Sequence, residues 1–179
     1  MTFIICHFNH CVKNYYRIIL GKKHESFDEA KKGNFVGISF LEKIDFSNEL
    51  MTYTEFSTKF VPTYLELYPN APKPAAALAS GMLWRFVNLL QIGDIVFCPD
   101  GKGSYHVGEI SSNYQYHEDS SLPHSREVTW HSKTLPRTEM SKQLRNSLGS
   151  VLTLITINEK SNEIESLLSD SSPNMITVS

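Results

Sequence analysis

Residues 93–130 constrain the fold more than any other stretch, because strand and turn signals follow one another there without a break. Residues 94–98 are mostly apolar and lead into residues 99–103 (PDGKG), whose proline, aspartate and glycines supply the backbone angles of a hairpin turn. Residues 104–110 predict a returning strand with large side chains at alternate positions, and residues 126–130 predict another. Strands joined by turns indicate a mixed or antiparallel sheet, not a doubly wound α/β fold.

The flanking segments predict helices placed between further strands. Strands are expected over residues 14–20, 34–40 and 151–157, and helices over residues 26–33, 54–67, 75–90, 138–147 and 161–168. Ser26 and Glu29 fit a capping box at the start of the first helix. Thr54 is expected to cap the second helix, and Pro62 to kink or split it.

These elements predict an α+β domain in which about six strands curl into a small mixed β-barrel, with the helices packed outside. The folded domain is expected over residues 14–168. Residues 1–13 are expected to form an N-terminal extension and residues 169–179 a flexible C-terminal tail.

Length and composition bound the class of protein. The 179 residues are 41% hydrophobic and 20% charged, which is typical of one soluble domain with a real core. No window approaches eighteen uninterrupted apolar residues, so no membrane partner is expected. Three cysteines, an odd number, favour the reducing cytoplasm over a disulfide framework. The net charge of −2 argues against bulk coating of nucleic acid, although residues 124–145 carry five cations against two acids, a local +3.

Sequence motifs for catalysis or for cofactor binding are absent. No phosphate loop, dinucleotide glycine fingerprint, zinc-protease helix or nucleophile elbow occurs. Asp100 and Glu109 resemble the carboxylate pair of a nuclease site, but the second residue after Glu109 is Ser111, where a lysine is needed. Asp100 also lies in a turn, where a structural role explains it. We therefore predict no catalytic residue and no cofactor.

One cluster near the amino terminus has the side chains of a metal site. Cys6, His7, His10 and Cys11 lie within six residues. Structural zinc sites usually combine two such pairs separated by a longer stretch, because one short segment rarely wraps four ligands around one ion. We therefore predict no metal site and interpret this segment as part of the extension.

Aromatic and amide side chains in the central sheet suit the recognition of a planar group. Tyr114, Tyr116 and Trp130 offer ring faces, each of which contributes about 1–3 kcal/mol when it stacks on a base. Asn34 or Asn113 offers hydrogen bonds to the edge of a base that is flipped into such a pocket. Packing of the same rings in the core of the sheet is the alternative that the residues leave open.

Several stretches, taken together, carry a resemblance to a known family. They are YYRIILGKK, FDEAKKGNFVGISF, GMLW, IGDIVFCPDGKGSYHVGEISSNYQYH, LPHSREVTW and PRTEMSKQLRNSLGS. The segment between residues 15 and 164 resembles the modified-base-reading domains of the PUA/EVE superfamily. More closely, it is similar to the amino-terminal domain of Mrr-type restriction endonucleases.

The resemblance implies a PUA/EVE-like barrel that scans double-stranded DNA and flips a modified base into an aromatic cage. The domain would be the non-catalytic reader of a restriction or phage-defence system, and cleavage would belong to a separate nuclease domain or subunit. Many members carry tryptophan near the position of Phe40, so the phenylalanine here narrows the stacking surface. An RNA-binding module of the same fold, a nuclease acting on modified DNA and a pure interaction domain remain as alternatives.

The expected binding residues form two sets, one for the base and one for the phosphates. The base is expected to contact Asn34, Phe40, Asn113, Tyr114, Tyr116 and Trp130. The phosphates are expected to contact Arg126, Arg137, Lys142 and Arg145, because cationic side chains form charge-assisted hydrogen bonds with phosphate.

Overall fold

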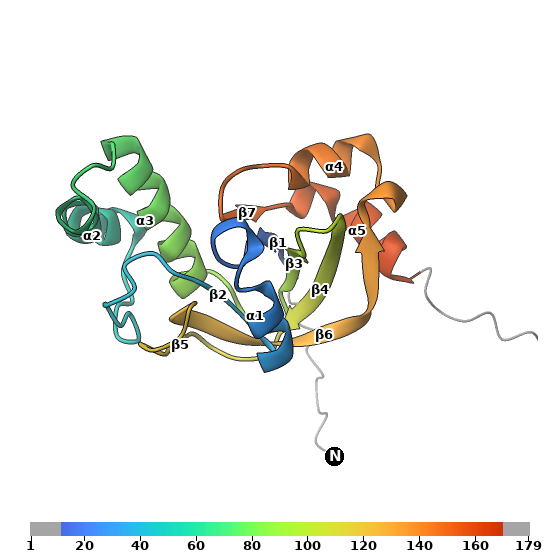
Figure 1. Ribbon diagram of the computed structural model, residues 1–179, viewed down its shortest axis with the longest axis horizontal. Helices are drawn as coiled ribbons and strands as arrows, with labels where there is room; N and C mark the ends of the chain where they lie inside the picture. Colours follow the sequence, from blue (N-terminus) through green and yellow to red (C-terminus); the bar gives the residue numbers. More distant parts are fainter. Residues whose placement is uncertain (1–11, 170–179) are drawn as a thin grey trace, which may run out of the picture.

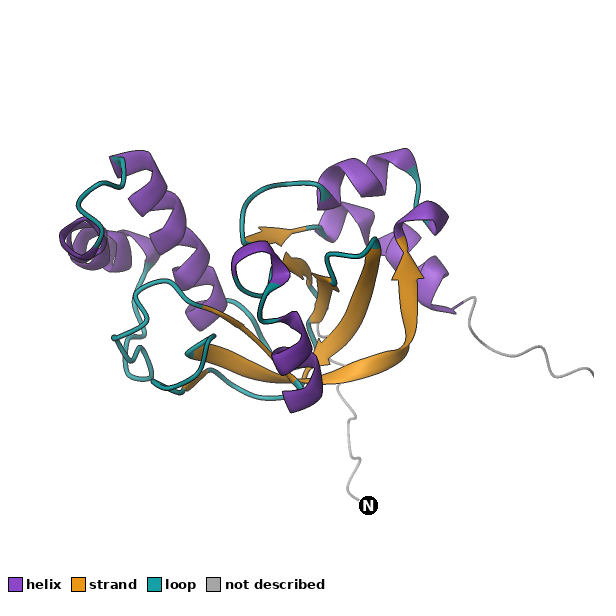
Figure 2. Cartoon of the chain, in the orientation of Figure 1, coloured by secondary structure: helices purple, strands orange, loops and turns teal. Residues whose placement is uncertain are grey.

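The computed structural model describes residues 12–169 as one curled sheet with helices on both of its faces (Figure 1, Figure 2). The strands are β1 (Tyr15–Ile18), β2 (Phe35–Ile38), β3 (Ile95–Pro99), β4 (Ser104–Ile110), β5 (Gln115–Tyr116), β6 (His124–Pro136) and β7 (Leu154–Thr156). The helices are α1 (Phe27–Gly33), α2 (Tyr53–Leu67), α3 (Lys73–Asn88), α4 (Lys142–Leu148) and α5 (Ser161–Ser169), with 3-10 turns η1 (Lys22–His24), η2 (Arg137–Glu139) and η3 (Asn158–Lys160).

The sheet is mixed, and it curls into a half-barrel without closing. Its strand order is β2-β6-β4-β3-β1-β7, and β5 pairs with β6 on the side opposite β2. Only β1 and β3 run parallel; the other pairs are antiparallel. The expected α+β class and mixed sheet are therefore confirmed. The strands β2 and β7 are the two edges of the sheet, and we call the gap between them the seam.

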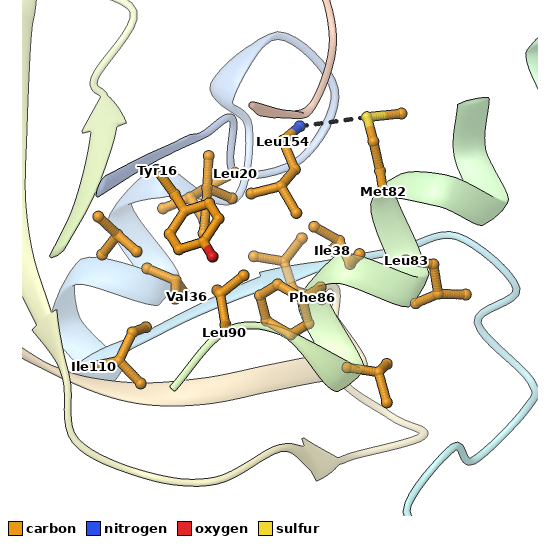
Figure 3. Packing of buried hydrophobic residues seen from close by; sticks show 14 of the residues in the cluster. Tyr16, Leu20, Val36, Ile38, Met82, Leu83, Phe86, Leu90, Ile110 and Leu154 are labelled. Atoms are coloured by element: carbon orange, nitrogen blue, oxygen red, sulfur yellow. Dashed lines mark hydrogen bonds between the residues drawn. The ribbon is translucent and has the colours of Figure 1, made fainter. Parts of the chain in front are cut away.

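The helix α3 occupies the place where a closing strand would lie. The backbone N–H of Leu154 points away from β1, on the free edge of β7, and donates to Sδ of Met82 at 3.4 Å (Figure 3). A β7 of three residues and a β2 of four residues offer little edge for pairing. The helix thus covers part of an exposed strand edge, which is one way in which proteins protect such edges.

Two hydrophobic clusters lie on opposite faces of the sheet, because neighbouring residues of a strand point to opposite sides. In β1, Tyr16 and Ile18 face the concave cluster, which α1, α2 and α3 complete. Tyr15 faces the convex cluster, which α4 and α5 complete. Phe86 of α3 lies inside the concave cluster near Val36 (Figure 3). The predicted burial of the apolar helix over residues 75–90 is confirmed.

The helix ends differ from the predictions in two places. The side chain of Ser26 makes no capping bond, and its hydroxyl instead accepts from the hydroxyl of Ser121 at 3.1 Å. Thr52, not Thr54, caps α2 and forms the capping box with Glu55. Pro62 lies inside the continuous helix α2 and does not split it.

The structure bears on membrane insertion but not on the predicted ends of the chain. Within residues 12–169, no helix has the length and apolar character needed to cross a bilayer. Most of the predicted extension and tail, with the Cys6, His7, His10 and Cys11 cluster, lies outside the described residues.

Candidate functional site

The first residue of β6, His124, lies at the centre of the predicted aromatic residues. Its side chain is wholly buried. The rings of Phe46, Tyr114 and Tyr116 surround the imidazole, with centroid distances of 5.2, 6.0 and 5.6 Å. The imidazole therefore fills the space that a base would need between these rings. The two tyrosines do not form an open cage.

Hydrogen bonds fix the tautomer of His124 and the direction of the Tyr114 hydroxyl. Nε2 lies 2.7 Å from the carbonyl oxygen of Phe40, which only accepts, so Nε2 carries the proton. Nδ1 then accepts from the Tyr114 hydroxyl at 2.8 Å, and that hydroxyl accepts from the N–H of Phe46 at 3.3 Å. Burial lowers the pKa of His124 and raises the pKa of Tyr114, so both are neutral near pH 7.

Trp130 lies too far along β6 to join these rings. His124 and Trp130 point to the same face because they are six positions apart, an even number, but six residues of strand span about 20 Å. The indole packs on Gly108, where an added Cβ would come within 3.0 Å of its Cε3, and Lys31 Nζ lies 4.5 Å from its ring. The prediction of one cage formed by Phe40, Tyr114, Tyr116 and Trp130 is therefore wrong.

Tyr116 and Asn34 have structural roles. The hydroxyl of Tyr116 donates to the carbonyl oxygen of Glu42 at 2.8 Å and so ties β5 to the turn after β2. Asn34 ends α1 in the left-handed conformation, with φ of 55°, and its carbonyl oxygen accepts from the N–H of Val128 at 2.9 Å. It is a helix C-cap of the kind that asparagine tolerates.

Arg126 is buried beneath the end of α3. It is 3% exposed, and its Nε and Nη2 donate to the carbonyl oxygens of Phe86 and Val87 at 3.1 and 2.9 Å. Nη1 donates to the carbonyl oxygen of Ser112 at 3.3 Å. Burial lowers the pKa of Arg126 to about 10, so the group stays charged near pH 7. The contact of Arg126 with a DNA phosphate stays a prediction, because the guanidinium lies at the floor of a pocket and not on an open surface.

The other predicted phosphate contacts lie at the opposite end of the molecule from β5 (Figure 1). Arg137 donates to the Tyr105 hydroxyl and to the carbonyl oxygen of Arg145, both at 3.1 Å, and so caps α4. Lys142 is exposed and Arg145 is half-buried. These cations do not surround the predicted base-binding residues.

Two pockets lie on either side of the His124 cluster. The first, which we call the arginine pocket, has a volume of about 510 Å³ and lies between the end of α3, the loop before α2 and the segment that precedes β5. Three predicted residues line it, Asn113, Tyr114 and Arg126. The second, which we call the seam pocket, has a volume of about 230 Å³ and is lined by Phe40. The remaining lining of the seam pocket is Ile19, Gly21, Lys22, Ile38, Ser39, Leu122 and Thr153.

The carboxylates that resemble a nuclease pair do not meet. Asp100 Oδ1 accepts from the N–H groups of Lys102 and Ser104 at 2.7 and 3.1 Å, as a turn residue does. Glu109 is level with Ile95, five residues from Asp100 along β3, which corresponds to about 16 Å. Ligands of one magnesium ion lie about 2.1 Å from it. Among residues 12–169, no group of three or more His, Cys, Asp or Glu side chains is placed to hold a metal.

Sequence reasoning missed His124, Lys22 and Thr153. The alternation of His124, Arg126, Val128 and Trp130 did contain a signal, because it places a histidine and an arginine on the buried face of one strand. Lys22 and Thr153 gave no signal, since they are 131 positions apart and meet only through the pairing of β1 with β7.

Comparison with known proteins adds a family assignment. Residues 16–159 match the model of a family described as Domain of unknown function (DUF8426). The chain belongs to this family. The match begins in β1 and ends in η3, so the DUF8426 domain contains every strand of the curled sheet except the first residue of β1. Among curated proteins, none matches the chain.

Proposed function

We propose that this domain binds a modified base of double-stranded DNA, flipped out of the helix into the seam pocket. It acts as a non-catalytic reader of PUA/EVE type in a cytoplasmic restriction or phage-defence system, with a nuclease domain or subunit as its partner. The observation that carries the proposal is the position of Phe40. Phe40 lines a pocket that lies where the edges of β2 and β7 stay unpaired with each other.

The size of the seam pocket suits one base. Pockets for drug-sized ligands measure about 300–1,000 Å³, and a single base is smaller than such a ligand. At about 230 Å³, the seam pocket is smaller than the arginine pocket and more enclosed. A snug pocket is what a flipped base requires, because stacking and edge contacts offset the energy of unstacking it.

The chemistry of the lining suits a base and its flanking phosphate. The ring of Phe40 provides a stacking face, and the hydroxyls of Ser39 and Thr153 provide hydrogen bonds for a base edge. The edges of β2 and β7 are not paired with each other, so their backbone groups, apart from the Leu154 N–H that donates to Met82, offer further donors and acceptors. Lys22 is exposed at the pocket and can contact a phosphate.

Binding of short duplexes tests the proposal. Fluorescence anisotropy at low salt compares an unmodified duplex with duplexes that carry N6-methyladenine, 5-methylcytosine or 5-hydroxymethylcytosine at one position. We expect the wild type to prefer one modified duplex. Phe40→Ala removes a stacking contact of about 1–3 kcal/mol, so the preference falls by about 5- to 150-fold while binding of the unmodified duplex persists. Phe40→Trp keeps or increases the preference.

Trp130→Ala is the matched control, because it removes a larger ring about 20 Å away along β6. It leaves the ratio of modified to unmodified binding unchanged. A loss of preference in Trp130→Ala but not in Phe40→Ala contradicts the proposed pocket. Tighter binding of a matched RNA supports the RNA-binding alternative, and nicking of methylated plasmid with magnesium supports the nuclease alternative.

A further inference from the structure

The arginine pocket has a charged group at its floor that the proposed reading of bases does not use. Arg126 lines this pocket although it is 3% exposed. Its hydrogen bonds go to three carbonyl oxygens, and among residues 12–169 no carboxylate lies within 4 Å of it. Burying a cation that has no carboxylate in contact with it costs free energy, so another group must stabilise the charge of Arg126.

The end of α3 compensates for only part of this charge. Carbonyl groups at the carboxyl end of a helix carry about half a negative charge in total. Two of the acceptors of Arg126, the carbonyl oxygens of Phe86 and Val87, belong to this end. Asp94, a buried carboxylate farther than 4 Å from the group, also favours the charged form of Arg126, but it accepts no hydrogen bond from the guanidinium.

The guanidinium also has donors to spare. It carries five N–H groups, and one on each nitrogen makes the bonds to Phe86, Val87 and Ser112. Each terminal nitrogen keeps a second N–H, for which the described part of the chain shows no acceptor. A ligand in the pocket can therefore accept hydrogen bonds from Arg126 while α3 stays capped.

The rest of the lining indicates what kind of anion fits. Leu50 and Ile92 are 90% and 54% exposed, and with the ring of Tyr114 they provide apolar contacts. Side-chain amides of Asn88, Gln91 and Asn113 add polar contacts without charge. Since Arg126 is the only charged side chain among the described lining residues, the pocket suits a ligand with one singly charged anionic group. A phosphate monoester carries a charge of about −1.5 to −2, which is more than one guanidinium group neutralises.

We propose that the arginine pocket binds a carboxylate attached to an apolar group, with the carboxylate on Arg126 and the apolar group against Leu50, Ile92 and Tyr114. Such a group occurs in small aromatic or aliphatic acids and at the carboxyl terminus of a peptide with an apolar last residue. This site is separate from the seam pocket and does not depend on the reading of bases.

Titration with benzoate tests the site, with the uncharged benzamide as its matched ligand. Chemical shifts of the backbone amides of Gln91 and Asn113 report binding in NMR spectra of the full chain. We expect benzoate to bind with a Kd at least ten times lower than that of benzamide. Equal affinities, or no shift changes with benzoate, overturn the proposal.

A charge change at the rim tests the position without disturbing Arg126, whose replacement also uncaps α3. Asn113 is exposed, so Asn113→Asp adds a negative charge near the bound carboxylate and raises the Kd of benzoate about 5- to 10-fold, with little effect on benzamide. Asn146→Asp makes the same change on the exposed surface of α4 and leaves both Kd values unchanged. Equal effects of the two substitutions overturn the proposal.

Two further arms identify the source of the carboxylate and separate the two sites. The first arm uses a peptide that ends in Gly-Phe with a free carboxylate, and its C-terminal amide is the control. If peptide ends are the natural ligands, this peptide binds more tightly than benzoate. If small acids are the natural ligands, it binds no more tightly than benzoate. Phe40→Ala leaves the benzoate Kd unchanged, and Asn113→Asp leaves the ratio of modified to unmodified DNA binding unchanged. Failure of one site is therefore distinguishable from failure of the other.

Discussion

The seam pocket and the arginine pocket lie on either side of His124, which contacts one residue of each lining and which we call the shared wall, but the two linings differ in charge. His124 separates them, since its Nε2 bonds the carbonyl oxygen of Phe40 on one side and its Nδ1 bonds Tyr114 on the other. The seam pocket has an uncharged lining apart from Lys22, and it opens along unpaired strand edges. The arginine pocket is about twice as large and contains a buried cation.

This difference shows that one side chain can separate residues that are all suited to the same binding site into two pockets. Tyr114 and Phe40 both qualify as walls of an aromatic site, yet His124 bonds the hydroxyl of Tyr114 and the backbone carbonyl of Phe40. Each pocket therefore keeps one of the candidate rings and acquires a different chemistry from its other walls. An aromatic face with hydroxyls favours a base, whereas a guanidinium with apolar neighbours favours a carboxylate.

The largest expected effect concerns the buried arginines. Arg17 is wholly buried and donates to the carbonyl oxygens of Leu152 and Ser150 at 2.6 and 2.7 Å, with no pocket among those described beside it. We expect Arg17→Met to lower the free energy of unfolding by about 3 kcal/mol, because it leaves two carbonyl groups without donors. Arg126→Met lowers it by about half as much, because water enters the arginine pocket and hydrates the carbonyls it leaves.

Urea unfolding followed by circular dichroism at pH 7 measures this difference. At ten times its Kd, benzoate raises the stability of the wild type by about 1.4 kcal/mol. This increase disappears in Arg126→Met and persists in Arg17→Met. Equal destabilisation by the two substitutions would mean that the arginine pocket is as closed to water as the surroundings of Arg17.

A second prediction tests the shared wall through Gly37 of β2. A Cβ there would lie 2.6 Å from the carbonyl oxygen of His124 and 2.8 Å from Cβ of Leu122, so β2 and β6 must move apart. We expect Gly37→Ala to lower the free energy of unfolding by about 1–3 kcal/mol and to weaken binding in both pockets. Gly81→Ala is the control. Its Cβ meets nothing closer than 3.6 Å, and alanine stabilises the interior of α3 by about 0.5–1 kcal/mol.

Thermal unfolding and the two ligand titrations give the result. If Gly37→Ala alters DNA binding and leaves the benzoate Kd unchanged, His124 is not a wall that the two pockets share.

The extent to which the sequence predicts this structure depends on whether a feature is local. The hairpin of β3 and β4 and the helix α3 were predicted closely, because turn residues and apolar periodicity lie within each segment. The capping box at Ser26 was wrong because Ser121, 95 residues away, takes the hydroxyl. A residue's tertiary neighbour outweighed its local preference in that case.

The candidate site shows the same limit. Alternation along β6 correctly places His124, Arg126 and Trp130 on one face, but it does not indicate that the first and last lie about 20 Å apart. It also does not indicate that Arg126 turns towards the end of α3, 40 residues earlier in the chain. The faces of strands follow from sequence, whereas the distances between side chains follow from the curl of the sheet.

A third prediction uses pH to act on the wall itself. Burial lowers the pKa of His124 below its usual value of 6.5, so the unfolded chain takes up this proton at a higher pH than the folded protein does. Stability is therefore complete above about pH 6.5 and falls as the pH is lowered, by at most about 1.4 kcal/mol per pH unit for one group. Protonation also removes the acceptor that holds the Tyr114 hydroxyl.

Urea unfolding between pH 7.5 and pH 5 measures the slope. Burial also lowers the pKa of His106, so protonation of this residue likewise reduces stability as the pH falls. His106→Gln and His124→Gln each therefore reduce the slope of the unfolding free energy against pH. An unchanged slope in His124→Gln would show that the imidazole takes up its proton without disturbing either pocket.

The smallest expected effect concerns the contacts with DNA phosphates, for which Lys22 and Lys142 are compared. Lys22 lines the seam pocket, whereas Lys142 is exposed on α4 and is not among the residues that line this pocket. One lost phosphate contact reduces the dependence of log K on log salt concentration by about 0.9 for duplex DNA. We expect this reduction in Lys22→Ala and no change in Lys142→Ala, measured by anisotropy across a salt series with an unmodified duplex. The reverse result would show that DNA binds to the face formed by α4 and that its phosphate backbone does not lie near the seam pocket.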